Sequence, residues 1–289
     1  MGAAAAFAVG GSGCIFNYPD PACGAAHVVA LTALAPDDWY VDSWTARAEA
    51  SERPWQWHVC LIADGITVAD TVIVHHGSQL DCDIKADAST GALQALVWTD
   101  YAGAYSLDDG HQARLQDGLR PQMAAEKEAW CGMALIGPGG GTVQLEHALA
   151  AVRIVATDAR EFDGVGRELE VTVVYPDPVP SVFDAGSSMA VYAEPSAGVV
   201  RTFTVTSAAG DVVLGGDLVM VNEAEQMVRM AVHIAEQGTL IASSPVMEVP
   251  VRRGHVTEVR GEFLTMMAGA GVSISPTFDG DFNYEISFD

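Results

Sequence analysis

The segment from Trp57 to His75 constrains the fold more than any other part of the chain. It holds two apolar runs, WHVCLIA and ITVADTVIVH, joined by the dipeptide Asp64-Gly65. Asp-Gly accepts the positive backbone angles of a tight turn, so the segment is predicted to be a hairpin of two antiparallel strands. Similar short segments, rich in Val, Ile, Thr and aromatic residues and separated by Gly, Asp, Asn and Pro, fill most of the chain. This pattern predicts an all-β protein.

Further strands are expected on both sides of the middle of the chain. They cover residues 79–85, 92–99, 133–136, 142–157, 168–175, 199–207, 217–221, 246–251, 255–264 and 272–275. Asn222 to Glu236 begins like a helix, but its apolar residues alternate with others, which favours a strand. The alternation continues through Gln237-Gly238 and predicts a second hairpin. Short helices are expected only at residues 36–52 and 124–130.

The length of 289 residues allows two domains, each with its own core. Each half offers enough strands for an antiparallel sandwich, and the long helices that connect parallel strands are missing. The least structured stretch between the halves is acidic and runs from Asp158 to Arg167. We therefore expect a leader at residues 1–24, an amino-terminal β-sandwich at 25–160 and a carboxyl-terminal β-sandwich at 161–289.

The charge of the chain excludes two classes of partner. Against 38 Asp and Glu there are 14 Lys and Arg, a net charge of -24, so nucleic acid and anionic membrane surfaces would repel it. Hydrophobic residues make up 49% of the chain and charged residues 18%, which is typical of a folded body and not of a disordered one. No apolar run reaches the roughly 18 residues of a membrane-spanning helix, so membrane attachment would need a lipid or a partner.

The amino terminus is similar to the end of a lipoprotein signal. Small and apolar residues run from Met1 to Gly13 and lead into Cys14, which is the predicted lipid-attachment residue. The run is short, lacks a preceding Lys or Arg, and has Gly11 where such signals usually have Leu. A truncated gene start would account for these departures. The alternative is a flexible leader with an incidental cysteine.

Four further cysteines, Cys23, Cys60, Cys82 and Cys131, leave two alternatives open. An even number in an exported protein allows disulfides, with three connectivities that spacing does not rank. Cys60 and Cys82 also lie inside expected strands, where a free thiol packs as a small apolar group. The spacings contain no CxxC and accompany no zinc-type histidine cluster, so no metal site is expected.

The sequence offers no catalytic constellation, and we expect no enzyme activity and no cofactor. No serine stands in a GxSxG turn. His75 and His76 are adjacent on a strand and point to opposite faces, which does not suit one shared metal. The acidic run from Asp279 begins like a calcium loop, but Tyr284 stands where that loop requires Gly.

Five segments together carry a family resemblance. They are CIFNYPDPAC at 14–23, LVWTDY at 96–101, VQLEHALAAVRIVATDAREF at 143–162, YPDPVPSVF at 175–183, and VPVRRGHVTEVRGEFLT with PTFDGDFNYEI between 249 and 286. In this order they resemble the fimbrillin superfamily of type V fimbriae, and most of all its anchor and minor-subunit lipoproteins. His147 and Ala148 stand where that family usually has Arg-Pro.

The resemblance implies two tandem transthyretin-like antiparallel β-sandwich domains. It further implies export to the cell surface, attachment to the outer membrane through the lipid, and anchoring or building of a fimbria by exchange of strands. The partners would be other fimbrial subunits. Shaft subunits of the family lose their first strand by cleavage after an arginine, which points to Arg47 and Arg53 here. An anchor would keep its first strand, expected around Val28 to Leu34.

A second hypothesis is a surface lipoprotein adhesin that binds a glycan or a host protein. It depends on an exposed aromatic patch around Trp39, Tyr40, Trp44, Trp55 and Trp57.

Overall fold

The protein is described by a computed structural model. It covers residues 27–35, 54–86, 92–101, 103–109, 111–116, 127–137, 139–162, 166–178, 180–191, 199–204, 210–221, 225–265 and 275–278. These residues form β-strands and turns without an α-helix, so the predicted all-β class is confirmed. The helix expected at 36–52 lies outside the described residues. The one expected at 124–130 is wrong at its end, because Ala129 and Trp130 open a strand that pairs with its neighbour in the sheet.

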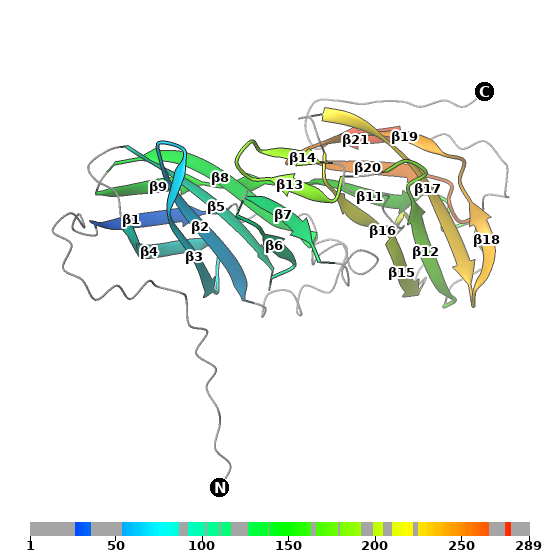
Figure 1. Ribbon diagram of the computed structural model, residues 1–289. Helices are drawn as coiled ribbons and strands as arrows, with labels where there is room; N and C mark the ends of the chain where they lie inside the picture. Colours follow the sequence, from blue (N-terminus) through cyan, green and yellow to red (C-terminus); the bar gives the residue numbers. More distant parts are fainter. Residues whose placement is uncertain are drawn as a thin grey trace, which may run out of the picture.

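Two sheets pack together in the amino-terminal half, on the left of Figure 1. Their strand orders are β4-β1-β9 and β10-β8-β5-β2-β3. The strands are β1 (His27–Leu34), β2 (Trp55–Ala63), β3 (Ile66–His75), β4 (Gln79–Ala86), β5 (Leu93–Tyr101), β8 (Ala129–Ile136), β9 (Gly140–Gln144) and β10 (Glu146–His147). Side chains that alternate along the strands fill the core between the two sheets, which is why period-two segments form these elements.

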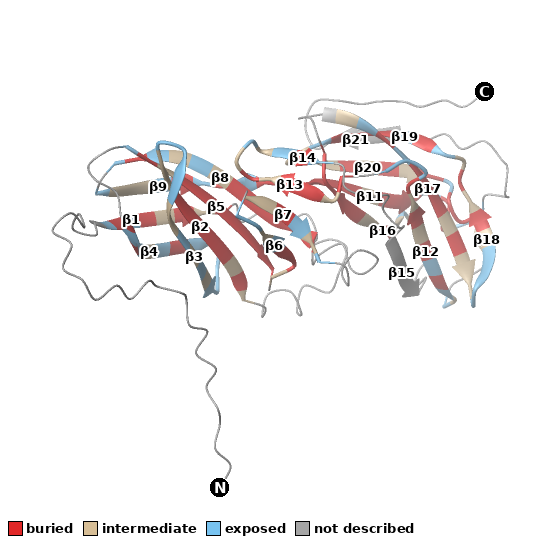
Figure 2. Cartoon of the chain, viewed as in Figure 1, coloured by how far each residue is buried: buried red, intermediate tan, exposed pale blue. Residues whose placement is uncertain are grey.

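The carboxyl-terminal half repeats this layered arrangement. One sheet has the order β16-β11-β20-β21, and the other has the order β15-β12-β17-β18, with β19 also paired to β17. The strands are β11 (Ala150–Ala156), β12 (Glu168–Val174), β15 (Val199–Thr204), β16 (Val212–Val219), β17 (Glu225–Glu236), β18 (Thr239–Ser243), β19 (Met247–Arg252), β20 (Val256–Gly261) and β21 (Ser275–Phe278). A second apolar core lies between them, and Figure 2 shows the buried residues inside both halves.

A small fifth sheet, β14-β13-β7-β6, lies at the junction of the halves. It consists of β6 (Tyr105–Leu107), β7 (Gln112–Leu115), β13 (Val182–Asp184) and β14 (Met189–Val191). It therefore joins strands from both halves of the chain. A third apolar cluster packs here, with residues that include Trp98, Phe183 and Leu218.

Both predicted hairpins are confirmed. Asp64 and Gly65 have φ angles of 50° and 77° and join β2 to β3, and Gln237 and Gly238 have angles of 47° and 78° and join β17 to β18. The ambiguous segment after Asn222 is thus a strand from Glu225 onward. The single strand expected at 142–157 is wrong, because the chain there is divided into β9, β10 and β11, which lie in three different sheets.

Most strand pairs among the described residues are antiparallel, as expected, but two are parallel. β1 pairs in parallel with β9, and β11 pairs in parallel with β20. The division into domains at residues 160 and 161 stays a prediction. β11, on the amino-terminal side of that division, pairs with β16 and β20 beyond it.

Candidate functional site

The first strand, β1, occupies a slot between two other strands. It pairs along its whole length with β4, from His27 opposite Ala86 to Leu34 opposite Gln79, and its second half pairs with β9. Its side chains alternate strictly. Val29, Leu31 and Ala33 are buried, whereas the preceding residue Val28 is 54% exposed. The inward side chains of β1 therefore form a row of apolar groups that fills the slot.

The walls and floor of this slot are apolar. The core cluster that contains the buried residues of β1 also contains Leu80 and Ile84 of β4, Val143 of β9, and Trp57 and Val59 of the facing sheet. If β1 left, two strand edges with unpaired backbone N–H and C=O groups would border an apolar groove. Such a groove fits an extended segment of another chain, because backbone groups supply affinity and alternate side chains supply specificity.

Two glycines bring β9 close to its neighbours. A Cβ atom on Gly140 would overlap the carbonyl oxygen of Ala30 in β1, and its φ of 110° is a conformation that other residues rarely adopt. A Cβ atom on Gly141 would lie 2.7 Å from Cγ2 of Ile136. These two positions at the start of β9 therefore require glycine, because β1 and β8 come close to them.

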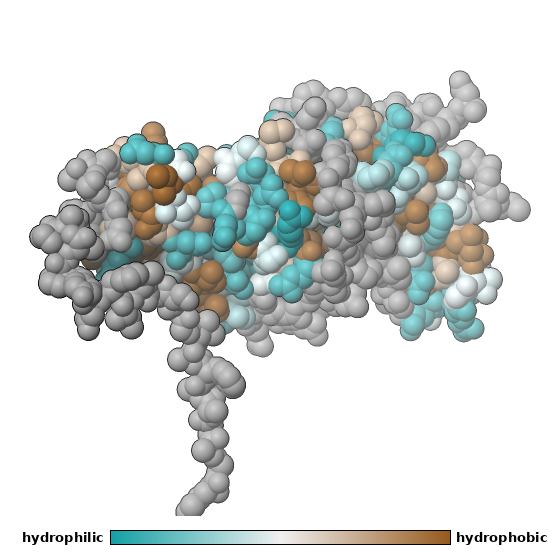
Figure 3. All heavy atoms as spheres, in the orientation of Figure 1, coloured by the Kyte–Doolittle hydropathy of each residue, from teal (hydrophilic) through white to brown (hydrophobic). Residues whose placement is uncertain are grey.

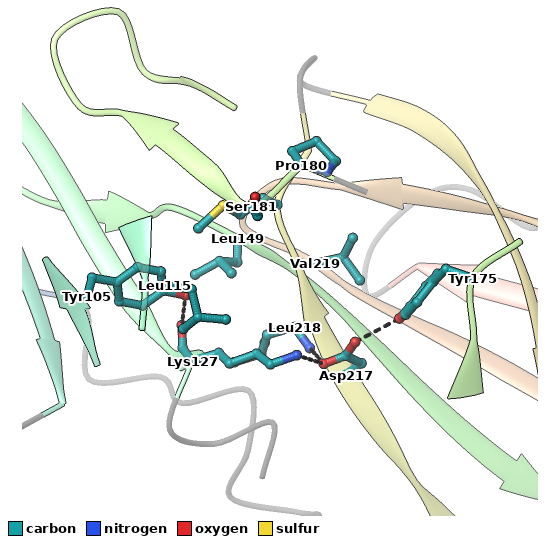
Figure 4. Close-up of a pocket in the computed structure, with 11 residues that line it drawn as sticks. Tyr105, Leu115, Lys127, Leu149, Tyr175, Pro180, Ser181, Asp217, Leu218 and Val219 are labelled. Atoms are coloured by element: carbon teal, nitrogen blue, oxygen red, sulfur yellow. Dashed lines mark hydrogen bonds and ion pairs between the residues drawn. The ribbon is translucent and has the colours of Figure 1, made fainter. Parts of the chain in front are cut away.

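A buried polar cluster lies at the junction of the two halves (Figure 4). The Lys127 Nζ donates to Asp217 Oδ1 over 2.9 Å, and the two side chains are 7% and 4% exposed. The Tyr175 hydroxyl donates to Asp217 Oδ2 over 2.9 Å, and the Leu218 amide donates to Oδ1 over 2.8 Å. Tyr105 donates to the Lys127 carbonyl over 2.6 Å. Lys127 precedes β8 in the first half, and Asp217 lies in β16, so the ion pair connects the halves.

The geometry of this cluster suits a structural contact between the two halves and does not suit a reaction. Its cavity of about 40 Å³ has room for little more than one water molecule. Burial, followed by the nearby Asp217 carboxylate, raises the pKa of Tyr175 well above its usual value and keeps the hydroxyl a neutral donor. Asp217 has an N–H or O–H donor on each oxygen, so this carboxylate is not free to act as a base.

Asp100, also close to the junction, is a buried carboxylate with N–H donors around it. It accepts from Trp98 Nε1 over 2.8 Å and from the Ala104 amide over 2.9 Å. Burial raises the pKa of Asp100 to about 7, against the opposing effect of these hydrogen bonds. The Asp100 carboxyl group therefore titrates near neutral pH.

Asp100 is expected to make stability depend on pH. Because its pKa in the folded chain is above that of an unfolded Asp, folding takes up a proton between about pH 4 and pH 7. This group alone should lower the free energy of unfolding by about 1.4 kcal/mol per pH unit as pH rises through that window. Urea unfolding at several pH values should show a shallower slope for Asp100→Asn, and an exposed control, Asp109→Asn, should keep the wild-type slope. Equal slopes for wild type and Asp100→Asn would contradict the assignment.

The lipid-attachment and processing residues predicted from the sequence, Cys14, Arg47 and Arg53, lie outside the described residues. They stay predictions. The structure does describe β1, which lies between Cys14 and Arg47 in the sequence.

Cys60, Cys82 and Cys131 are free thiols in the structure. Burial raises the pKa of Cys60 to about 12, with a further contribution from the nearby Asp70, and burial also raises the pKa of Cys131 to about 12. Thiols of this kind are protonated and unreactive at neutral pH. Cys23 lies outside the described residues, so the disulfide hypothesis stays a prediction.

The exposed aromatic patch of the adhesin hypothesis is wrong for two of its members. Trp55 and Trp57 are only 5% and 0% exposed, and Trp55 stacks on Trp57 and Trp130 with ring centroids 5.8 Å and 4.7 Å apart. They belong to the amino-terminal core because they share the inward face of β2. Trp39, Tyr40 and Trp44 lie outside the described residues.

The described part of the chain holds no group of three or more His, Cys, Asp or Glu side chains placed to bind a metal. A membrane-spanning helix is likewise not found among the described residues. What the geometry offers is a first strand enclosed between two others and a buried ion pair that connects the halves.

Comparison with known proteins identifies the family of the chain. Residues 66–287 match a family of unknown function, DUF6562, and the chain belongs to that family. No curated protein matches the sequence.

Solved structures share the fold. A putative cell adhesion protein from Bacteroides ovatus superposes with a TM-score of 0.51 at 10% identity, over 92% of this chain and 100% of that one. Another, from Bacteroides eggerthii, gives 0.52 at 12% identity over 88% and 96%. The likeness is weaker, 0.46 at 8% identity over 90% and 99%, to the fimbrial anchor protein Mfa2 from Porphyromonas gingivalis. The expected resemblance is thus confirmed at the level of the fold.

Proposed function

We propose that the chain is a non-enzymatic cell-surface protein that anchors or builds a type V fimbria through strand exchange between subunits. The observation that carries this proposal is β1, a terminal strand with three buried apolar residues, inserted between two strand edges. The shared fold with putative cell adhesion proteins supports it. Other fimbrial subunits are the proposed partners.

The position of β1 relative to the expected processing residues supports the mechanism. Arg47 and Arg53 follow β1 in sequence, so cleavage there would separate β1 from the rest of the sandwich. The slot left behind would be apolar and bordered by backbone groups that need partners. In an anchor, the strand stays and the chain is held to the outer membrane by a lipid on Cys14.

The amino terminus of protein recovered from cells tests the anchor assignment. We expect the mature chain to start at an acylated Cys14, which mass spectrometry of the native protein detects. Cys14→Ser should release most of the protein from the outer-membrane fraction, because the lipid on Cys14 is the proposed attachment. Cys23→Ser is the matched control and should leave the protein in that fraction. A start at Ala48 or Pro54 would instead assign the chain to the polymerising subunits.

The fimbrial role itself is tested by deletion of the gene. Cells without the protein should carry fewer attached fimbriae by electron microscopy and should shed fibres into the medium. Unchanged numbers of attached fimbriae and no shed fibres would contradict the proposal.

A further inference from the structure

β3 is an exposed edge strand that lacks the usual protection against pairing. It pairs along its length with β2, and no described strand pairs with its other edge. Natural edge strands are commonly short, or carry Lys, Pro or inward charges. β3 has ten residues, and Asp70 is its only acidic or basic side chain besides the terminal His75. The hairpin has a bulge near its turn, where Leu61 pairs with Ala69 and Ile62 with Thr67, so that Val68 is the extra residue of β3; residues 69–75 beyond it pair regularly.

The outward face of β3 is apolar as well as exposed. Val72 and Val74 point outward and are 51% and 66% exposed, whereas Ile73 packs against the core from the other face. Ile66 is 68% exposed, but it lies beyond the bulge at Val68 and opposite Ala63, on the other face of the hairpin. Figure 2 shows the strand in the colour of exposed residues along much of its length, and Figure 3 shows hydrophobic atoms at the surface over the β2–β3 hairpin. Val72 and Val74 thus form a short apolar strip on an open sheet edge, which is a typical interaction surface.

The sequence of this strip is complementary to itself. In an antiparallel pair of two β3 strands centred on Ile73, Val72 lies opposite Val74 of the second copy, and Val74 lies opposite its Val72. Asp70 then lies opposite His76 of the second copy. His76 directly follows the strand and is exposed. Cross-strand neighbours of this kind stabilise a sheet when apolar groups meet apolar groups and an acid meets a donor.

We propose that β3 pairs with the β3 strand of a second copy of this chain, about a two-fold axis at Ile73. The pairing joins the two five-stranded sheets edge to edge and closes as a dimer, because the same patch is used on both sides. The second copy is favoured over an unrelated strand by the match of Asp70 to His76 and of Val72 to Val74 in one register. That register leaves Ile66 outside the paired segment.

The dimer is expected to be weak in dilute solution. A pair of short strands buries little area, which is typical of transient contacts with a Kd in about the micromolar range or higher. The net charge of -24 on each copy opposes association, so added salt should strengthen it by screening charges beyond about 8 Å. Copies held on one surface meet at a much higher effective concentration, where a weak contact is sufficient. The contact would then link neighbouring copies laterally.

Sedimentation of the full chain, from about 1 µM to about 1 mM, tests the proposal. The wild type should pass from monomer to dimer. Val72→Lys with Val74→Lys puts like charges directly opposite each other and should weaken the dimer at least about tenfold. Ile66→Lys is the control, since it adds one exposed positive charge on the same strand but outside the paired segment, and it should leave the dimer unchanged. All three side chains are exposed, and thermal unfolding should confirm that the variants fold normally.

A charge exchange tests the register. His76→Asp alone sets two acids opposite each other and should weaken the dimer, and His76→Asp with Asp70→His should restore it. A wild type that stays monomeric at every concentration overturns the proposal. Equal loss of the dimer in Ile66→Lys and in the double lysine variant overturns the register, as does failure of the charge exchange to restore it.

Discussion

Replacement of Lys127 by methionine is expected to lower the free energy of unfolding by about 3–5 kcal/mol, because it leaves the Asp217 carboxylate buried without a cation. Asp217→Asn should cost a similar amount, since it leaves a buried ammonium group without an acid. The double variant removes both charges and should recover a large part of the loss. The difference between the double variant and the sum of the single ones, measured by urea unfolding, is expected to be about 2 kcal/mol.

An exposed ion pair is the matched control for this double-mutant cycle. Arg229 and Asp177 lie 3.2 Å apart with side chains 47% and 54% exposed, and Arg229→Met should cost about 0.5 kcal/mol or less. If Lys127→Met were as mild as Arg229→Met, the junction pair would not hold the halves together as described.

Gly140→Ala is expected to be the most damaging small change in the first sheet, with a loss of about 3 kcal/mol or more in the free energy of unfolding. The new Cβ would overlap the backbone of Ala30, and the φ of 110° would strain any other residue. Hydrogen exchange should show that the amides of β1 lose protection before those of β2 and β5, because the substitution acts on the contact between β9 and β1.

The neighbouring glycine separates this effect from a general loss of loop flexibility. A Cβ atom on Gly139 would meet nothing within 4 Å, so Gly139→Ala should change stability by about 0.5 kcal/mol or less. Equal losses in the two variants, or uniform loss of protection in the whole half, would contradict the close approach of β9 to β1.

Local signals in the sequence were sufficient for the hairpins. Asp64-Gly65 and Gln237-Gly238 each stand between apolar runs, and the turn conformations that they favour are the ones present. The long apolar run that contains β10 and β11 carries no such turn signal, so its division between sheets was missed. A chain that passes from one buried sheet into another is apolar along its whole length. The period of its apolar residues therefore does not show where it leaves the first sheet.

The junction could not be predicted from the sequence for a different reason. Lys127 and Asp217 are 90 residues apart, and neither stands in a motif. A buried ion pair can be recognised only from a structure, which shows that both charged side chains are buried. By contrast, the first strand was expected around Val28 to Leu34 from the family resemblance, and it lies close to that position, between β4 and β9.

The parallel pairing of β1 with β9 also sets an order of events in time. Leu34 and Gln144 lie 110 residues apart in the chain, yet the side-chain Nε2 of Gln144 donates to the carbonyl oxygen of Leu34 in the folded protein. Contacts between such distant residues form late, because the intervening loop has to close first. During synthesis β1 can therefore pair with β4 before β9 has been made, and its second edge stays open until then. An enzyme or a partner that acts on this segment early meets a strand with an open edge, and one that arrives late meets a strand that is already enclosed on both sides.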